Sequence, residues 1–189
     1  MPPKVKITKE NILEASLKLV RKKGFSSLNA RAIAKELNCS TQPIFSFYAT
    51  MEEAKADVII TAREYFYRFF DENIKRQDVP PYKSSGLAYI QFAKEEQELF
   101  KLLFMRDRTD EENQVSGYNF DSAIKMIMNA VGLDYDTAKK FHLETYIFTH
   151  GIATMIATSY MDMSDELINQ VLTDAYQGLL RLYCPNKGK

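Results

Sequence analysis

Apolar residues recur along most of this chain at steps of three and four, the spacing that places side chains on one face of an α-helix. The first such run begins after Thr8, a suitable N-cap, and stops at Gly24, a common residue at helix C-termini. Its inward face consists of Ile12, Leu13, Ala15, Ser16, Leu17, Leu19 and Val20. The pattern therefore predicts a first helix between Thr8 and Gly24.

Two shorter helices are predicted next. Asn29 is a good N-cap for a helix that ends at Leu37. Asn38 tolerates the left-handed backbone that a tight turn between helices needs, and Ser40 is expected to cap a third helix that runs to Tyr48. Two short helices joined by a tight turn behind a longer helix match the layout of a helix-turn-helix.

Longer helices are predicted for the rest of the chain. Residues Thr50–Glu53 have the sequence of a capping box, which opens a fourth helix that continues to about Lys75. Further helices are expected over 82–96, 97–106, 117–132, 134–160 and 164–183, with a polar, mobile loop from Asp107 to Ser116. The chain has only 7 Gly and 6 Pro, so long stretches contain no helix breaker. The predicted fold class is all-α.

Composition narrows the class of protein. Hydrophobic residues make up 46% of the chain, which is enough to form a core. No run of about 18 apolar residues is present, and the N-terminus lacks the apolar centre of a signal peptide. Cys39 and Cys184 lie far apart and form no motif, so reduced thiols are the simplest interpretation. We therefore expect a cytoplasmic protein that does not contact a membrane.

The formal net charge is zero, but the two ends of the chain differ. Residues 1–50 hold nine Lys and Arg against three acidic residues, a net charge of +6, and the remainder carries −6. A basic head on an acidic body suits a polyanionic partner for the head alone. An ordinary solvated surface is the alternative explanation.

The stretch from Ile12 to Ala54 resembles the tetracycline-repressor (TetR) family of bacterial regulators. The matching pieces are Ile12-Leu13-Glu14-Ala15, Gly24-Phe25, Ala32-Ile33-Ala34-Lys35-Glu36, Ser40-Thr41-Gln42-Pro43-Ile44-Phe45-Ser46-Phe47-Tyr48 and Glu52-Glu53. The rest of the chain is similar only in length and helical pattern, apart from His150-Gly151. The chain departs from the family pattern at three positions, where Gly, a His-like residue and a phosphate-contacting Lys are frequent: Asn38, Phe47 and Met51.

This resemblance implies a three-helix, helix-turn-helix DNA-binding domain over residues 1–49 and a larger helical ligand-binding and dimerisation domain over 50–189. It implies a transcriptional regulator that binds a palindromic operator in double-stranded DNA as a homodimer, usually a repressor that a small-molecule inducer releases. A dimer also makes physical sense, because two recognition helices need a spacing near a whole number of DNA turns.

The predicted recognition helix has few polar side chains. Gln42 is suited to bond an adenine edge, and Pro43 and the methyl group of Thr41 are suited to touch a thymine methyl. Phosphate contacts are expected from the N-terminal lysines and from the start of the second helix, and Phe45 and Tyr48 divide between core packing and backbone contact. The complete set of expected DNA-contacting residues is Lys4, Lys6, Ser27, Asn29, Arg31, Ser40, Thr41, Gln42, Pro43, Phe45, Ser46, Phe47 and Tyr48.

The body contains two further candidate surfaces. Apolar residues of the last two helices recur at steps of three and four and predict a packing seam, for which intrachain core is one explanation. The resemblance implies instead a dimer interface, formed by Phe148, Ile152, Met155, Ile168, Leu172, Ala175, Leu179 and Leu182. The middle of the chain is rich in aromatic residues and Met, which suits an apolar or aromatic ligand, although ordinary core is an equal explanation for each residue. The expected ligand-binding residues are Phe66, Phe69, Tyr89, Phe92, Phe104, Tyr118, His142, Tyr146 and His150.

An enzyme is not expected, because the sequence has no phosphate-binding loop and no convincing catalytic triad. We expect no cofactor and no metal, since His142 and His150 are eight residues apart and therefore about 80° out of register on a helix. Two alternatives stay open: a helical protein-interaction module that has lost DNA binding, and a DNA binder controlled by a protein partner. Salt-dependent DNA binding separates the first alternative from a regulator.

Overall fold

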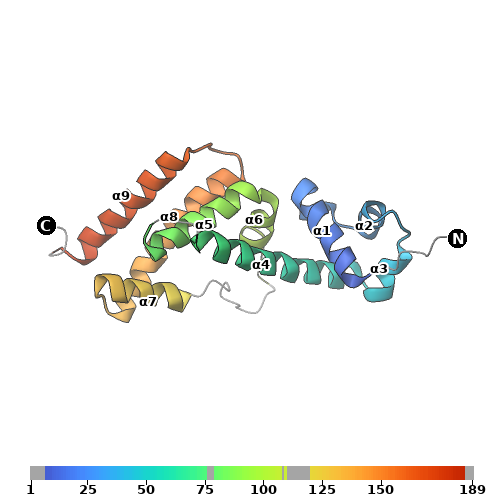
Figure 1. The fold of residues 1–189 in the computed structure, drawn as a ribbon, viewed down its shortest axis with the longest axis horizontal. Helices are drawn as coiled ribbons and strands as arrows, with labels where there is room; N and C mark the ends of the chain where they lie inside the picture. The colour runs from blue at the N-terminus through green and yellow to red at the C-terminus, as the bar shows by residue number, and fades with distance from the viewer. Residues whose placement is uncertain (1–6, 76–78, 108, 110–119, 186–189) are drawn as a thin grey trace. The chain divides into compact units, whose positions relative to one another are not determined.

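The computed structural model describes residues 7–75, 79–107, 109 and 120–185, and every regular element in these ranges is helical (Figure 1). The all-α prediction is therefore confirmed. The elements are α1 (Lys9–Lys23), the short 3-10 helix η1 (Phe25–Ser27), α2 (Ala30–Glu36), α3 (Gln42–Phe47), α4 (Met51–Lys75), α5 (Pro81–Glu95), α6 (Gln97–Phe104), α7 (Phe120–Val131), α8 (Tyr135–Ala157) and α9 (Asp165–Tyr183).

The chain divides into two compact units. Unit 1 comprises Met1–Arg68 and Glu96–Arg106, and unit 2 comprises Phe69–Glu95 and Asp107–Lys189. Helix α4 begins in unit 1 and ends in unit 2. These units describe packing; the division into a DNA-binding part up to residue 49 and a ligand-binding part beyond it stays a prediction.

Helix α1 begins and ends where the sequence predicts. The Thr8 side chain accepts a hydrogen bond from the Asn11 backbone N–H, and the Asn11 side chain accepts one from the Thr8 N–H. Gly24 ends the helix with a φ of 76°, which favours glycine. A Cβ atom at Gly24 would also lie 2.7 Å from a carboxylate oxygen of Glu98. A side chain here would therefore be strained by the backbone conformation, and the flexible Glu98 side chain would have to move aside.

The helix-turn-helix forms with one correction to its predicted caps. Asn29 caps α2 by accepting a hydrogen bond from the Ala32 N–H at 3.0 Å, and Asn38 adopts the predicted left-handed conformation with a φ of 51°. The N-cap of α3 is Thr41 rather than Ser40, and its side chain makes no capping hydrogen bond. Helix α3 is consequently shorter than predicted.

The start of α4 also differs slightly from the expected capping box. The Thr50 hydroxyl accepts a hydrogen bond from the Glu53 N–H at 3.2 Å, as the motif requires. The Glu53 carboxylate, however, accepts from the N–H of Ala49, one residue before the expected partner. The helix begins at Met51 all the same.

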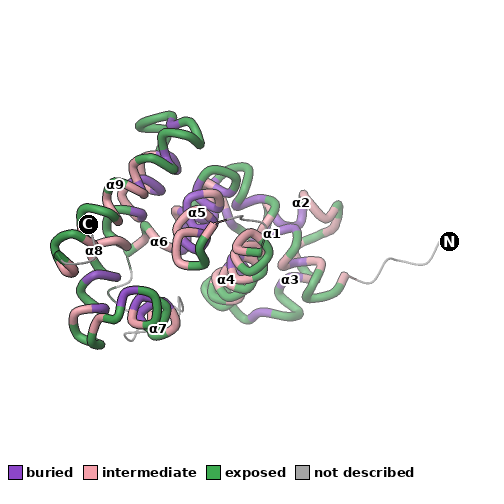
Figure 2. The backbone as a smooth tube through the Cα atoms, turned by 60° about the vertical axis from the view of Figure 1, so that its left-hand side comes forward, coloured by how far each residue is buried: buried purple, intermediate pink, exposed green. Residues whose placement is uncertain are grey.

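Unit 2 is built from α5, α7, α8 and α9, with α8 packed against the other three. Asp134 and Ser164 cap α8 and α9 through their side chains. Figure 2 shows buried and exposed stretches alternating along these helices, as expected for amphipathic elements. Of the predicted loop from Asp107 to Ser116, residues 108 and 110–116 lie outside the described part of the chain.

The described residues include no candidate membrane span and no candidate metal site. None of their helices combines the length and apolar character that crossing a membrane requires. They also contain no group of three or more His, Cys, Asp or Glu side chains arranged to hold a metal ion. Cys39 and Cys184 are free thiols.

Candidate functional site

Helix α3 is held by one side and presents the other to solvent. Ile44 is completely buried and anchors the helix, whereas Gln42 and Ser46 are exposed. Phe45 and Phe47 are 50% and 45% exposed, which is unusual for phenyl groups on a helix this short. The exposed face thus offers one amide, one hydroxyl and two aromatic rings.

Tyr48 requires a correction. It was predicted among the DNA-contacting residues, but it is only 4% exposed. Its ring packs in unit 1, with the ammonium group of Lys9 lying 5.3 Å from the ring centre. Tyr48 therefore belongs to the core beneath α3, and it is removed from the candidate DNA contacts.

The flanking candidate residues differ in exposure and in whether their side chains already form hydrogen bonds within the chain. Asn29 is exposed, but its amide oxygen caps α2 and its amide nitrogen donates to the Ser27 carbonyl at 3.1 Å. Ser27 is half-buried, and its hydroxyl donates to the Gly24 carbonyl at 2.7 Å. Arg31 and Ser40 are exposed, whereas Thr41 and Pro43 are half-buried. The predicted contacts at Lys4 and Lys6 lie outside the described residues.

Several cations of the basic head are already paired with carboxylates. Lys9 lies 2.6 Å from Asp57, and Lys18 forms an ion pair with Glu36. The pKa of Glu36 is lowered, first by its hydrogen bond from Lys18 and further by nearby lysines. Within the described part of the head, the exposed cations outside these ion pairs include Lys22, Lys23, Arg31 and Lys35.

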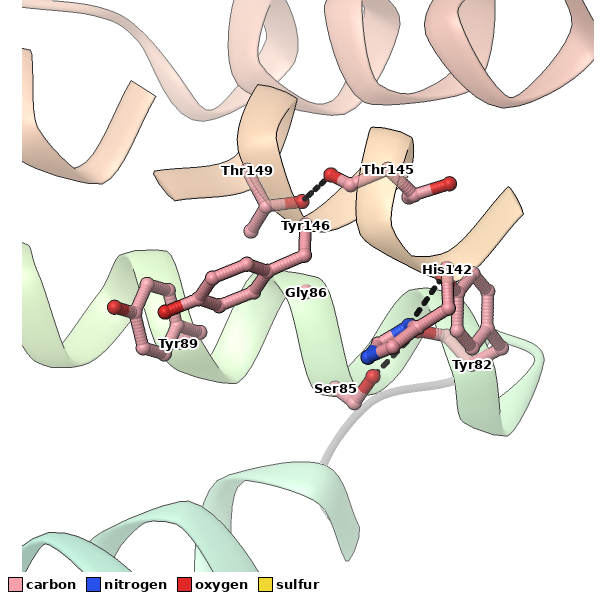
Figure 3. A pocket seen from close by; sticks show the side chains of 8 residues that line it. All are labelled: Tyr82, Ser85, Gly86, Tyr89, His142, Thr145, Tyr146 and Thr149. Carbon is pink, nitrogen blue, oxygen red and sulfur yellow. Dashed lines mark hydrogen bonds between the residues drawn. The ribbon is translucent and has the colours of Figure 1, made fainter. Parts of the chain in front are cut away.

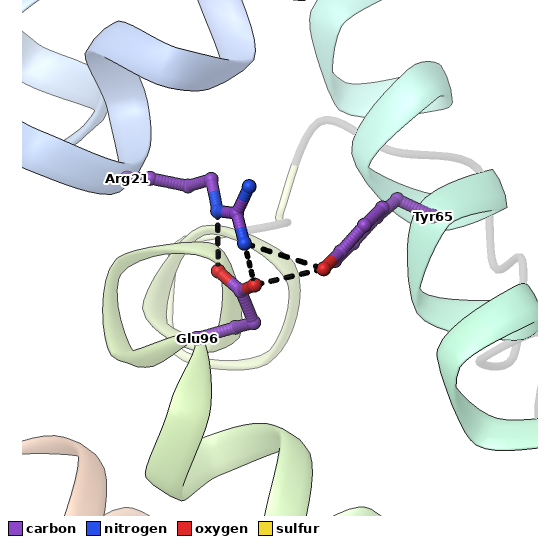
Figure 4. Close-up of polar contacts among 3 residues, drawn as sticks. All are labelled: Arg21, Tyr65 and Glu96. Carbon is purple, nitrogen blue, oxygen red and sulfur yellow. Dashed lines mark hydrogen bonds and ion pairs between the residues drawn. The ribbon is translucent and has the colours of Figure 1, made fainter. Parts of the chain in front are cut away.

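A third ion pair joins an exposed arginine to a buried glutamate and has an additional partner (Figure 4). The Arg21 guanidinium at the end of α1 donates two hydrogen bonds to the carboxylate of Glu96, one from Nε at 2.7 Å. The Tyr65 hydroxyl of α4 donates to the same carboxylate at 2.8 Å. The Glu96 side chain is 6% exposed and that of Arg21 is 48% exposed. This cluster connects α1, α4 and the start of α6 within unit 1.

Unit 2 contains an open cleft of about 650 Å³, large enough for a drug-sized ligand. A smaller space of about 30 Å³ shares Tyr82, Gly86, Thr145 and Thr149 with it and is bounded further by Ser85, Tyr89, His142 and Tyr146. Helices α5, α7, α8 and α9 all contribute to the lining. A Cβ atom at Gly86 of α5 would meet the side chain of Thr149 of α8 at 3.8 Å, an ordinary contact distance.

Tyrosine and histidine side chains form a ladder between α5 and α8 beside the cleft (Figure 3). The Tyr82 hydroxyl lies 3.0 Å from Nδ1 of His142, and the Tyr89 hydroxyl lies 2.9 Å from Nδ1 of His150. Tyr146 stands between the two pairs, stacked on His150 with ring centres 5.7 Å apart. Burial lowers the pKa of both histidines, that of His142 to about 4. Both rings are therefore neutral near pH 7.

The predicted ligand-binding residues divide into two sets. Tyr89, His142 and Tyr146 line the small space, and His150 lies beside it through its contact with Tyr89. The other described candidates require correction because they form core contacts instead: Phe66 packs on Phe104 in unit 1 at 5.1 Å, and Phe69 packs on the buried Phe92 in unit 2 at 5.3 Å. Tyr118 lies outside the described residues.

Sequence reasoning missed several lining residues, Tyr82 and Thr145 among them. One pattern could have identified Tyr82. Tyr82 and Tyr89 are two helical turns apart, and His142, Tyr146 and His150 follow one another at four-residue steps. Two facing helices with matched stripes of polar aromatic residues indicate a shared polar layer rather than an ordinary core.

The predicted dimer interface also requires correction. Ile152, Ile168 and Leu172 are buried within one chain, so they cannot meet a second copy. Leu179 packs against the cluster around Phe141. Among the remaining predicted interface residues, Met155 and Ala175 are half-buried, and Phe148 and Leu182 are exposed.

The apolar faces of α8 and α9 that stay exposed lie at a different register. On α8, Leu143 and Ile147 are 49% and 60% exposed, and a Cβ at Gly151 would meet no atom within 4 Å. On α9 the corresponding stripe is formed by Leu167, Val171, Ala175, Gly178 and Leu182, which are exposed or half-buried. We call these two stripes the outer faces of α8 and α9.

Comparison with known proteins connects this architecture to a known fold. A scan of protein-family models finds no match, and neither does a search of curated proteins. Among solved structures, a protein from Vibrio parahaemolyticus described as a TetR-family transcriptional regulator superimposes with a TM-score of 0.60 at 13% identity, covering 88% of this chain and 95% of that chain. A protein of unknown function from Rhodococcus sp. RHA1 superimposes with a TM-score of 0.67 at 19% identity, covering 97% and 99%. This chain therefore has the all-α fold of a TetR-family regulator.

Proposed function

We propose that this protein is a sequence-specific DNA-binding transcriptional regulator that acts as a homodimer. The observation that carries the proposal is the outward face of α3, where Gln42, Ser46 and two phenyl rings stand exposed on a helix anchored by the buried Ile44. A helix of this kind fits the major groove, where donors, acceptors and thymine methyl groups distinguish the base pairs. The left-handed turn at Asn38 places α3 in a helix-turn-helix.

Phosphate binding is assigned to the exposed cations around α3. Arg31 and Lys35 lie on α2, and Lys22 and Lys23 end α1. Each cation that neutralises a phosphate steepens the salt dependence of binding by about one unit in the logarithmic slope. Arg21 is not assigned this role, because its guanidinium is engaged with Glu96.

We infer that the dimer forms through the outer faces of α8 and α9. Exposed leucine and isoleucine side chains beside glycine on a helix are unfavourable in water, and a second copy would cover them. The glycines would let two helices approach closely. A two-fold dimer would present two α3 helices to the two halves of a palindromic site.

A small molecule bound in the cleft of unit 2 is proposed to control DNA affinity, with release of a repressor as the expected sign. Helix α5 lines the cleft through Tyr82 and Gly86, and it is followed directly by Glu96, which holds Arg21 of α1. A ligand that favours one position of α5 thereby acts on the start of α6 and on α1. Control requires that the ligand bind the two states with different affinity.

The test is fluorescence anisotropy of the full chain with duplexes enriched from a random DNA library, at several salt concentrations. We expect selective binding of a palindrome at two chains per site, weakening steeply with salt. Gln42→Ala should lose about 1–3 kcal/mol on the selected site and relax specificity at one base pair. Arg31→Gln should weaken all DNA alike and reduce the salt slope by about 1.

The principal alternative is a protein-interaction module on a helix-turn-helix scaffold. The two exposed phenyl rings of Phe45 and Phe47 and the absence of Lys and Arg from α3 favour it specifically. Two results together would favour this alternative over the regulator. The protein would enrich no DNA sequence from the library, and it would bind DNA no more tightly than a Phe45→Ala, Phe47→Ala double variant does.

A further inference from the structure

The small space beside the cleft of unit 2 is lined by a histidine with a buried polar atom that has no partner. His142 is 4% exposed, and its Nε2 atom has no hydrogen-bond partner among the described residues. The other ring nitrogen, Nδ1, lies 3.0 Å from the Tyr82 hydroxyl. A buried donor or acceptor left unsatisfied is costly, so a site of this kind favours a ligand that completes the hydrogen bond.

The protonation of the two ring nitrogens follows from their neighbours. A phenol is a better donor than a neutral imidazole and a poorer acceptor, so Tyr82 donates to Nδ1. The ring is neutral, because burial lowers the pKa of His142 to about 4. The single ring proton then resides on Nε2, which makes Nε2–H a hydrogen-bond donor that requires an acceptor.

The serine and threonine hydroxyls of the small space already donate their protons to backbone carbonyls. The hydroxyl of Thr145 donates to the Phe141 carbonyl, that of Thr149 to the Thr145 carbonyl and that of Ser85 to the Tyr82 carbonyl. The space of about 30 Å³ beside His142 has room for one small group, such as an oxygen atom. Aromatic walls from Tyr82, Tyr89 and Tyr146 surround it.

The charge of the lining restricts the ligand further. Among the described lining residues of the larger cleft, Lys83 is the one charged side chain, and it donates to the Thr173 hydroxyl at 2.9 Å. The described lining residues include no carboxylate, so a cationic ligand would be desolvated there without compensation. An uncharged group, or the oxygen of a carboxylic acid directed towards Lys83, does not meet this penalty.

We propose that the cleft binds an aromatic carbonyl compound, with its ring in the cleft beside Tyr82 and Tyr176 and its carbonyl oxygen in the small space, where it accepts a hydrogen bond from Nε2–H of His142. This assignment rests on the proposed ligand control, because it names the chemistry of the same site. The carbonyl belongs either to a neutral ketone or to a carboxylic acid, and the two sources differ in their need for Lys83.

The experiment is isothermal titration calorimetry of the full chain with four naphthalene probes of the same ring. The first two, 2-acetylnaphthalene and 2-isopropenylnaphthalene, are nearly isosteric, and only the first has an acceptor oxygen. The ketone should bind roughly tenfold more tightly, the factor expected for one satisfied buried donor. The other two are 2-naphthoic acid and 2-(aminomethyl)naphthalene, of which the cationic amine should bind most weakly.

Matched variants connect this selectivity to His142. In His142→Phe the preference for the ketone over the alkene should fall to within about twofold, while both still bind. His150→Phe removes the hydrogen bond between His150 and Tyr89; because His150 itself does not line the small space, this variant should retain the preference. Tyr82→Phe keeps the imidazole but frees its tautomer, so the preference should decrease. Lys83→Met should weaken the acid alone if the acid is the better ligand.

Several outcomes would overturn the proposal. These are equal affinity for ketone and alkene, an amine that binds as tightly as the ketone, an unchanged preference in His142→Phe, or no binding of any probe. If His142→Phe does not fold, as shown by the lack of a cooperative melting transition, Tyr82→Phe takes its place, and an unchanged ketone preference in that variant would overturn the proposal. DNA binding is measured separately, so ketone selectivity without any DNA binding would reject the regulator and keep the site. Selective DNA binding without ketone selectivity would reject the ligand site and keep the regulator.

Discussion

The Arg21–Glu96 pair gives the sharpest prediction about stability, because its two side chains differ in burial. The Glu96 carboxylate is 6% exposed, whereas the Arg21 side chain is 48% exposed. Removing the cation leaves a buried anion whose remaining donor in the cluster is the Tyr65 hydroxyl. Removing the anion leaves a guanidinium that can turn into water. The two single substitutions should therefore differ in cost, although they break the same pair.

The magnitudes follow from this asymmetry. Breaking a fully buried pair by removing one partner costs about 3–5 kcal/mol, and the solvent already around Arg21 reduces that value. We expect Arg21→Gln to lower the free energy of unfolding by about 2–3 kcal/mol. Glu96→Gln should lower it by about 1–2 kcal/mol, since the amide oxygen still accepts from Tyr65.

The assay is urea denaturation followed by far-ultraviolet circular dichroism, with Lys18→Gln as the matched control. Lys18 lies on the same helix and pairs with Glu36, but its side chain is 59% exposed. Exposed pairs contribute between zero and about 1 kcal/mol, so this control should change stability little. The argument is refuted if Glu96→Gln costs as much as Arg21→Gln, or if Lys18→Gln costs as much as either.

Three further predictions concern unit 2. Ile147→Glu should convert the dimer to monomers in analytical ultracentrifugation. Ile60→Glu, which alters an isoleucine 52% exposed on α4, is the control and should remain dimeric. If both variants are dimers, the outer faces are not the interface. The pKa of His142 falls from 6.5 to about 4 in the folded state, so between these values the unfolded chain binds a proton that the folded chain does not. The free energy of unfolding should therefore decrease as the pH is lowered from 6.5 towards 4. In His142→Phe about 2–3 kcal/mol of that loss between pH 7 and 4.5 should vanish, and an unchanged slope would contradict the assignment. Gly86→Ala should raise the melting temperature, because alanine favours the helix by up to about 1 kcal/mol over glycine. The new methyl group would meet the Thr149 side chain at an ordinary 3.8 Å. A lower melting temperature would contradict this and show that α5 and α8 leave no room for the methyl group.

Local features of the fold could be predicted from the sequence because the residues that determine them are neighbours in the chain. The cap at Thr8, the cap at Asn29 and the left-handed turn at Asn38 each depend on contacts within a few residues. The incorrect cap at Ser40 is instructive. The residue that precedes α3 is Thr41, whose backbone is helical rather than extended, and its side chain makes no capping hydrogen bond.

The side of a helix that faces the core could not be predicted where both sides are apolar. Helix α9 has one apolar series that includes Ile168 and Leu172 and a second that includes Leu167 and Val171. Both have helical spacing, and only the packing of α9 on the rest of unit 2 selects the first as core. Ile168 and Leu172, which the sequence assigns to a dimer interface, therefore lie in the core of unit 2, whereas Ala175 and Leu182 also belong to the outer face of α9.

Aromatic content had the same limitation in the middle of the chain. Phe66 and Phe92 are as apolar as any cleft residue, yet each is fully surrounded by neighbours in its own unit. A residue that lines a cleft differs from a core residue in having empty space on one side, and amino-acid composition carries no information about that space. The tyrosines and histidines were more informative, because their polar ends require partners and so restrict where they can lie.

The formal charge of the head overstates the attraction that the folded head offers to DNA. Lys9 and Arg21 are paired with Asp57 and Glu96, both outside residues 1–50, so counting these partners lowers the net charge of the head from +6 to +4. Exposed acidic residues also follow α3 at the start of α4. With weaker long-range attraction, non-specific affinity decreases more than specific affinity, because base contacts do not depend on net charge. The short-range contacts of Gln42 and the phenyl rings must then supply a larger share of binding, which should make this protein more selective than the sequence charge alone suggests.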